Sequence, residues 1–198
     1  MSQTNANIAA LIGSRICHDL ISPVGAITNG LELLALGGTQ AGPEFSLISD
    51  SAAHANARIR FFRIAFGIVS EGQMVSAAEI VSSVAGVFEN KHRVHWGING
   101  SMPRTVTQAT FLALLCAEQA IPRGGIIDVK GNNSTVNMAI EGSKISFNSI
   151  YWDILDSGNI PENLPPAQVQ FALLHTVLSS LDRKVTINAR DTNFTLSF

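Results

Sequence analysis

The chain carries little charge. Of its 198 residues only 14% are Asp, Glu, Lys or Arg, and the formal net charge at pH 7 is −2. This balance and the sequence pI of about 6.2 argue against the basic surface by which proteins bind nucleic acids. The mean hydropathy of +0.24 is high for a soluble monomer. We therefore expect a second chain to cover part of the apolar surface.

Long apolar runs and cysteines are also scarce. No apolar run approaches the roughly 18 residues needed to span a bilayer, and the N-terminus lacks the basic start and cleavage site of a signal peptide. The two cysteines, Cys17 and Cys116, have no metal-type spacing and suit a reducing compartment. These absences predict a soluble, cytoplasmic protein that binds neither membranes nor nucleic acid.

The first third of the sequence has the periodicity of two helices. "GGTQAGPE" at residues 37–44 ends the first helix with its glycines and begins a second, about Glu44 to Gly67, with Pro43 near its first turn. Such a helical hairpin has too little core alone, so we expect two hairpins to form a dimeric four-helix bundle. The apolar stripe of the first helix consists of Ile8, Ile12, Ile16, Leu20, Val24, Ile27, Leu31 and Leu34.

A polar break at Val69–Gln73 separates this hairpin, residues 1–70, from a second domain, residues 73–198. The second domain alternates helices and strands, which predicts an α/β sandwich with one mixed or antiparallel sheet and helices on one face, and an α+β chain overall. Helices are expected at about Ser76–Phe88, Pro103–Ile121 and Pro166–Leu181, and strands at Arg93–Ile98, Ile126–Lys130, Thr135–Ile140, Lys144–Phe147, Lys184–Ala189 and Phe194–Phe198.

The segment "SRICHDLISPVGAITNG", residues 14–30, places polar residues in the first helix. At about 100° per residue, His18 lies two positions from both Ile16 and Leu20 and therefore points away from the apolar stripe. An accessible imidazole on that face suits a docking surface better than a core. The other residues expected on this outward face are Ser14, Arg15, Ile21, Ser22 and Gly25.

Two further residues of this segment bear on His18. Asp19 lies about 100° round the helix. It does not face His18 as an i+4 partner would, but its carboxylate can favour the imidazolium and hold or remove a ring proton. Pro23 has no amide hydrogen and crowds the carbonyl of Asp19, which predicts a kink just beyond His18. From the residues alone, an exposed His–Asp pair is more often an ordinary solvated helix surface than a chemical site.

The segment "HDLISPV" resembles the phosphoacceptor box of sensor histidine kinases, and the proline five residues after the histidine is its specific part. With "RICHDLISPVGAITNGLELL", "ARIRFFRIAFG" and "IPRGG" in that order, nearly the whole chain resembles the ChpT-type histidine phosphotransferases of alphaproteobacteria.

The resemblance implies a homodimer in which His18 accepts phosphate from the aspartate of one receiver domain and passes it to another. The receivers would belong to a hybrid histidine kinase and to response regulators, and would supply Mg²⁺, while this chain would bind no cofactor. Asp19 would be the supporting acidic residue, Arg15 and Ser22 would flank the phosphoryl group, and Pro23 would be structural. The partner-binding surface would comprise Ser14, Arg15, Ile21, Ser22 and Gly25.

The second domain would then resemble a kinase ATP-binding domain without its nucleotide motifs. The positions of the kinase Asn-x-x-x-Asn pair hold Leu115 and Gln119, so the metal ligand is missing. "IEGSKISF" lacks the Asp-x-Gly-x-Gly turn, and "IPENLPPAQVQ" has three prolines where a glycine-rich phosphate loop would lie. These departures predict a protein that does not use ATP.

The remaining histidines have ordinary interpretations. We expect His54 to be a bundle residue, His175 a hydrogen-bonded core residue, and His92 and His95 to lack acidic partners and hence a metal. A non-catalytic docking module, which inhibits a histidine kinase or response regulator by binding, remains the alternative function.

Overall fold

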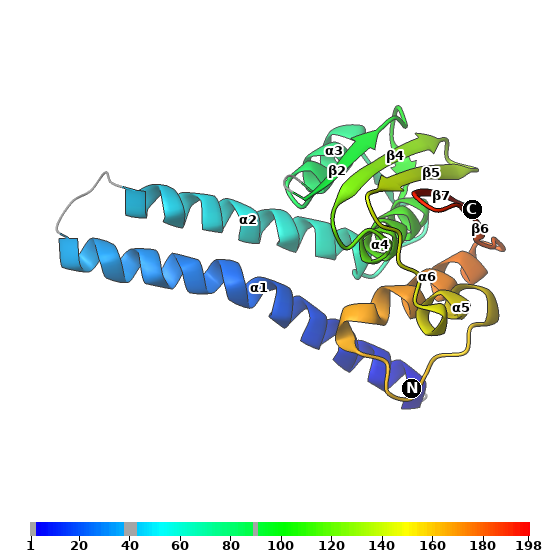
Figure 1. Cartoon of the computed structure of the whole chain (residues 1–198), viewed down its shortest axis with the longest axis horizontal. Helices are drawn as coiled ribbons and strands as arrows, with labels where there is room; N and C mark the ends of the chain where they lie inside the picture. The colour runs from blue at the N-terminus through cyan, green and yellow to red at the C-terminus, as the bar shows by residue number, and fades with distance from the viewer. Residues whose placement is uncertain (1–2, 38–42, 89–90) are drawn as a thin grey trace.

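A computed structural model describes residues 3–37, 43–88 and 91–198. Figure 1 shows that the first two helices extend side by side away from a more compact part, which holds the sheet and the other helices. The elements are α1 (Gln3–Gly37), α2 (Pro43–Ala65), β1 (Met74–Val75), α3 (Ala77–Ala85), β2 (His92–Trp96), β3 (Met102–Pro103), α4 (Arg104–Ala120), β4 (Gly125–Gly131), β5 (Val136–Gly142), α5 (Ser149–Ser157), the 3-10 helix η1 (Pro166–Gln168), α6 (Val169–Ser180), β6 (Thr186–Ala189) and β7 (Asn193–Ser197).

The helical hairpin has the predicted elements. α1 continues as one helix through Pro23 to Gly37. Its axis is bent rather than straight (Figure 1), as expected of a helix that contains a proline. The predicted connection at residues 38–42 lies outside the described residues. The two helices are the pair of elements with the most extensive mutual contact.

The larger of two sheets has five strands in the order β2-β4-β5-β7-β6. β2 and β4 are parallel, and the other neighbouring pairs are antiparallel. Inward side chains such as Ile127 and Ile140 share one core with α4, α5 and α6. The α+β class, the N-terminal hairpin and a mixed sheet with helices against one face are therefore confirmed.

The C-terminal end of α2 belongs to that same core. Phe61 stacks on Phe111 of α4 with ring centroids 4.6 Å apart, and its ring also meets Phe88 edge-on at 5.7 Å. Aromatic contacts of this kind add stabilisation beyond the area they bury. The base of the hairpin is thus embedded in the second domain, and the division near residues 70–73 stays a prediction.

Two polar side chains of α4, the buried Arg104 and the half-buried Gln108, also hold the end of α2. Arg104 donates from Nη1 to the carbonyl of Ile64 (2.7 Å) and from Nη2 to that of Arg63 (2.6 Å). Gln108 donates to the carbonyls of Ala65 (3.1 Å) and Gly67 (3.0 Å). The carbonyls of Arg63, Ile64 and Ala65 are among the last of the helix, which have no partner within it, and Gly67 follows its end. Burial lowers the pKa of Arg104, although the Glu79 carboxylate opposes that shift.

Two local predictions are wrong. Residues 144–147 form no strand, because the backbone of Ser146 donates to the carbonyl of Ala120 (2.8 Å) and β5 already pairs with β4 and β7. α5 was not predicted. Its signals were the N-cap Asn148, whose side chain accepts from the amide of Ile150 (3.1 Å), and Gly158 in the left-handed region at φ 70°.

Candidate functional site

His18 stands on the surface of α1 with its side chain 85% exposed. Its Nδ1 atom lies 3.1 Å from Oδ1 of Asp19, the next residue along the helix. An ionised carboxylate can only accept hydrogen bonds, so this contact places the proton of a neutral His18 ring on Nδ1. The other ring nitrogen, Nε2, then carries the lone pair that can attack an electrophile.

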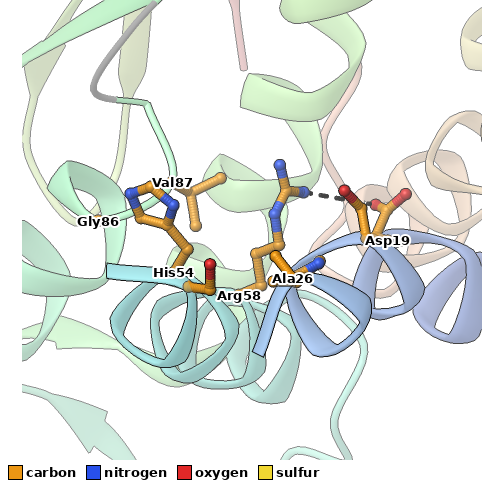
Figure 2. Close-up of a pocket in the computed structure, with 9 residues that line it drawn as sticks. Asp19, Ala26, His54, Arg58, Gly86 and Val87 are labelled. Atoms are coloured by element: carbon orange, nitrogen blue, oxygen red, sulfur yellow. Dashed lines mark ion pairs between the residues drawn. The ribbon is translucent and has the colours of Figure 1, made fainter. Parts of the chain in front are cut away.

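The second carboxylate oxygen of Asp19 faces two arginines. Nε of Arg15, one helical turn earlier, donates to Oδ2 at 2.8 Å. Nη1 of Arg58 approaches the same oxygen from α2 at 3.9 Å. Figure 2 shows the Arg58 side chain reaching from α2 across to Asp19 on α1. Both cations lie on the Oδ2 side of the carboxylate, while Oδ1 is directed to His18.

Arg15 does not lie on the exposed outward face. It is 7% exposed, and its Nη1 donates to the carbonyl of Ala167 at 2.7 Å. Ala167 belongs to η1 in the second domain, which contacts α1 here. The helical-wheel argument failed at Arg15 because it describes one helix by itself and cannot show what the rest of the chain covers.

The other predicted surface residues mostly lie where they were expected. Ser14, Ile21 and Ser22 are exposed, Ile21 with 69% of its surface accessible. Gly25 is half-buried, and a Cβ at this position would meet no atom of the described residues within 4 Å. Pro23 is half-buried. Their roles in partner binding stay predictions.

A cavity of about 240 Å³ adjoins Asp19 between α1, α2 and the turn after α3. Figure 2 shows His54 and Arg58 of α2 along this cavity, with Gly86 and Val87 opposite His54. His54 was expected to be an ordinary bundle residue and Arg58 was assigned no role, because the sequence does not show how the two helices pair. The residues that line the cavity are Asp19, Ser22, Pro23, Ala26, Ser51, His54, Arg58, Gly86 and Val87.

Histidines outside this site do have acidic partners, contrary to the prediction. His95 Nδ1 lies 2.9 Å from Asp128, its partner across β2 and β4, and His92 Nδ1 lies 3.6 Å from Glu118. These are pairs, and among the described residues no three or more His, Cys, Asp or Glu side chains are grouped as metal ligands. The predicted hydrogen bond of His175 is confirmed: Nδ1 lies 3.1 Å from the carbonyl oxygen of Leu155.

The positions that would serve a nucleotide in a kinase have other contacts. Leu115 is buried in the core, and Gln119 accepts a hydrogen bond from Nε2 of Gln168 at 3.3 Å. Gln168 ends η1, within the segment that stands in place of a glycine-rich phosphate loop. None of the described helices is long and apolar enough to cross a membrane.

Comparisons with known proteins agree with this arrangement. The family model "Histidine phosphotransferase C-terminal domain" matches residues 77–193. The chain is 42% identical over 127 residues to protein phosphotransferase ChpT of Brucella abortus (strain 2308), a match that covers 63% of this chain and 60% of that protein. The chain therefore spans less than two thirds of the length of this relative.

Solved structures extend the likeness to the whole chain. A bacterial phosphotransferase aligns with 100% of this chain and 97% of its own length, at 30% identity and a TM-score of 0.81. The histidine kinase ThkA, solved in complex with the response regulator protein TrrA, aligns with 99% of this chain and 62% of its own at 12% identity and a TM-score of 0.51, which shows a shared fold. Because the family match covers more than half of the chain, this protein belongs to the family defined by the histidine phosphotransferase C-terminal domain.

Proposed function

We propose that this protein relays phosphoryl groups between receiver domains of a two-component pathway through His18. The observation that carries the proposal is the exposed imidazole whose Nδ1 is engaged by Asp19, which leaves Nε2 as the nucleophile. Membership of the histidine phosphotransferase family supports it.

The transfer step follows from this geometry. The Nε2 lone pair attacks the phosphorus of a receiver's aspartyl phosphate, and the bond from phosphorus to the carboxylate oxygen breaks with its electron pair on the departing carboxylate. The proton stays on Nδ1, so the phosphorylated ring is an imidazolium that the Asp19 carboxylate stabilises. Attack by the aspartate of a second receiver reverses these changes and restores neutral His18.

The receiver would supply the remaining chemistry. Phosphoryl transfer requires in-line positioning and neutralisation of charge, which the receiver's acidic pocket and its Mg²⁺ would provide. We assign the phosphoryl source to a receiver and not to ATP, because Leu115 and Gln119 occupy the kinase metal-ligand positions. On this proposal Ser14, Ile21, Ser22 and Gly25 form the docking surface around His18.

A homodimer completes the proposal. The hairpin exposes large apolar side chains that a monomer would leave in water. Packing the hairpins of two copies as a four-helix bundle would bury such side chains. Besides Ile21, which belongs to the docking surface, the exposed large apolar residues of the hairpin are Val24, Leu31, Leu33, Leu36, Phe45, Leu47 and Ile59.

The test is acceptance of labelled phosphate by the full-length protein. Receiver domains of the source organism are charged with radiolabelled acetyl phosphate, purified and mixed with the wild type, His18→Ala or His54→Ala. We expect acid-labile, alkali-stable label on the wild type and His54→Ala, and none on His18→Ala. Label on His18→Ala would overturn the assignment. Receivers that bind the wild type without labelling it would favour the non-catalytic docking module.

A further inference from the structure

A buried contact between the two domains lies directly behind the phosphoacceptor site. Figure 1 shows the N-terminal part of α1 beside the segment that leads into α6. Arg15 is the side chain that joins them, because its Nε donates to Asp19 on α1 and its Nη1 donates to the carbonyl of Ala167 in η1.

The chemistry of Arg15 makes this a rigid connection. A guanidinium is planar, so the directions of Nε–H and Nη1–H are fixed relative to each other. A carbonyl that holds one of these donors therefore orients the other. Both bonds are short, at 2.8 and 2.7 Å, and the side chain is about nine-tenths buried, which restricts competition from water.

Contacts within the second domain hold the η1 segment, which carries the carbonyl of Ala167, in place. Gln168, next to Ala167, donates from Nε2 to Oε1 of Gln119 on α4 (3.3 Å), and its backbone amide bonds to the carbonyl of Pro165 (2.9 Å). Pro165, just before η1, and Pro166, its first residue, restrict the backbone there. The charge of Arg15 also acts on α4: burial raises the pKa of Cys116, and Arg15 opposes that shift.

We propose that Arg15 is a positioning residue, through which the η1 segment of the second domain orients Asp19 and thereby keeps the proton of His18 on Nδ1. This rests on the proposed function in one respect, namely that His18 attacks through Nε2. It gives the second domain a task that needs no nucleotide. Gln119 and Gln168, which stand where a kinase would hold ATP, support the carbonyl that holds Arg15.

The competing interpretation is that Arg15 only stabilises the fold. A purely structural residue would change unfolding without changing the tautomer of His18 in the folded protein. The tautomer is therefore the decisive readout, and it is measured on the unphosphorylated protein without any receiver.

The test records long-range ¹H–¹⁵N spectra of the full-length protein at pH 8.5, above the ordinary titration range of imidazole. The His18 signals are assigned by their loss in His18→Ala. The variants are Arg15→Met, which removes both hydrogen bonds, and Gln168→Ala, which loosens η1 without altering α1. The matched control is Arg63→Met, because Arg63 also pairs across the two domains, at 2.8 Å with Glu79, far from His18 along the chain.

We expect the Nδ1–H tautomer in the wild type and in Arg63→Met. In Arg15→Met we expect Nε2–H, the form that free neutral imidazole favours, to become the major tautomer. Gln168→Ala should shift the same way by a smaller amount. The rate of phosphoryl uptake by Arg15→Met should fall on the order of tenfold, because the nucleophilic nitrogen is then mostly protonated.

Two results would overturn the proposal. An unchanged His18 tautomer in Arg15→Met, or in Gln168→Ala if Arg15→Met does not fold, would show that the second domain does not set the proton position. A shift of equal size in Arg63→Met would show a general effect of weakened domain contact. Failure of the relay function would appear separately, as absence of label on the wild type.

Discussion

Asp19 holds His18 by a contact of 3.1 Å between Oδ1 and Nδ1, although the two residues are adjacent in one helix. Asp19 is largely shielded, with 11% of its side chain exposed, whereas His18 is 85% exposed. A shielded carboxylate, held by Arg15, thus supports an imidazole that is exposed to solvent. This arrangement suits a group that must meet a large partner and keep one ring nitrogen unprotonated.

Asp19→Asn should slow phosphoryl uptake by roughly 10- to 100-fold. The amide is neutral, so it stabilises the phosphoimidazolium less well than the carboxylate does. The initial rate of labelling by a charged receiver measures the effect. Asp128→Asn is the matched control, since Asp128 also bonds a histidine, at 2.9 Å from His95, on the sheet. Equal rates in Asp19→Asn and the wild type would contradict the assigned role.

Arg104→Met should lower the free energy of unfolding by about 2–4 kcal/mol, because it leaves the carbonyls of Arg63 and Ile64 without their donors. Urea unfolding measures the change. Arg63→Met, which removes the exposed ion pair to Glu79, should cost about 1 kcal/mol or less. The explanation fails if the two variants are destabilised equally.

The two cysteines should differ in reactivity. Cys17 is exposed and Cys116 is buried, and burial raises the pKa of the Cys116 thiol well above its usual value. Because the thiolate is the reactive form, iodoacetamide should alkylate Cys17 in the native protein and Cys116 only after unfolding. Intact mass spectrometry should show one adduct without urea and two with it. Two adducts at comparable rates in the native protein would count against the buried position of Cys116.

The raised pKa of the Cys116 thiol also predicts that the stability of the protein depends on pH. An unfolded cysteine ionises near pH ~8.5, and the folded Cys116 stays protonated at higher pH. Above that pH the unfolded state binds fewer protons, so the free energy of unfolding falls by up to ~1.4 kcal/mol per pH unit from this group. Urea unfolding of the wild type and Cys116→Ala between pH 7.5 and 10 tests this. The difference in free energy of unfolding between the wild type and Cys116→Ala should narrow as the pH rises. A difference that stays constant with pH would contradict this prediction.

Leu31→Asp should dissociate the proposed dimer. Leu31 is 55% exposed in the single chain, so the substitution changes the monomer's stability little, but a bundle of two hairpins would bury the new carboxylate. Sedimentation velocity gives the oligomeric state. Val81→Asp on α3 is the control, as Val81 is 46% exposed outside the hairpin. A monomeric wild type, or a dimeric Leu31→Asp variant, would contradict the bundle.

Much of the site could be predicted because its signals are local. The direction of His18 depends on its two apolar neighbours in the same helix, and its exposure is confirmed. The position of Arg15 could not be predicted in this way, because the covering residue, Ala167, is 152 positions away in the sequence. Arg58 was missed for a similar reason, since its approach to Asp19 depends on how α1 and α2 pair.

In the fold too, features set by local sequence could be predicted, and features set by distant contacts could not. Helices with strong periodicity and strands with clear alternation were placed within a few residues. Residues 144–147 alternate like a strand, but both sides of the preceding strand β5 are already paired, with β4 and β7, and such competition is invisible in the segment itself. α5 was not predicted, although Asn148 and Gly158 are its local start and stop signals.

The most direct test of the account is a relay assay with substoichiometric protein. One purified receiver is charged with radiolabelled phosphate, a second is uncharged, and the full-length protein is added at a small fraction of either concentration. We predict that label reaches the aspartate of the second receiver in amounts many times that of the protein, and that His18→Ala abolishes this transfer. Transfer that proceeds equally with His18→Ala would contradict the central claim that His18 carries the phosphoryl group.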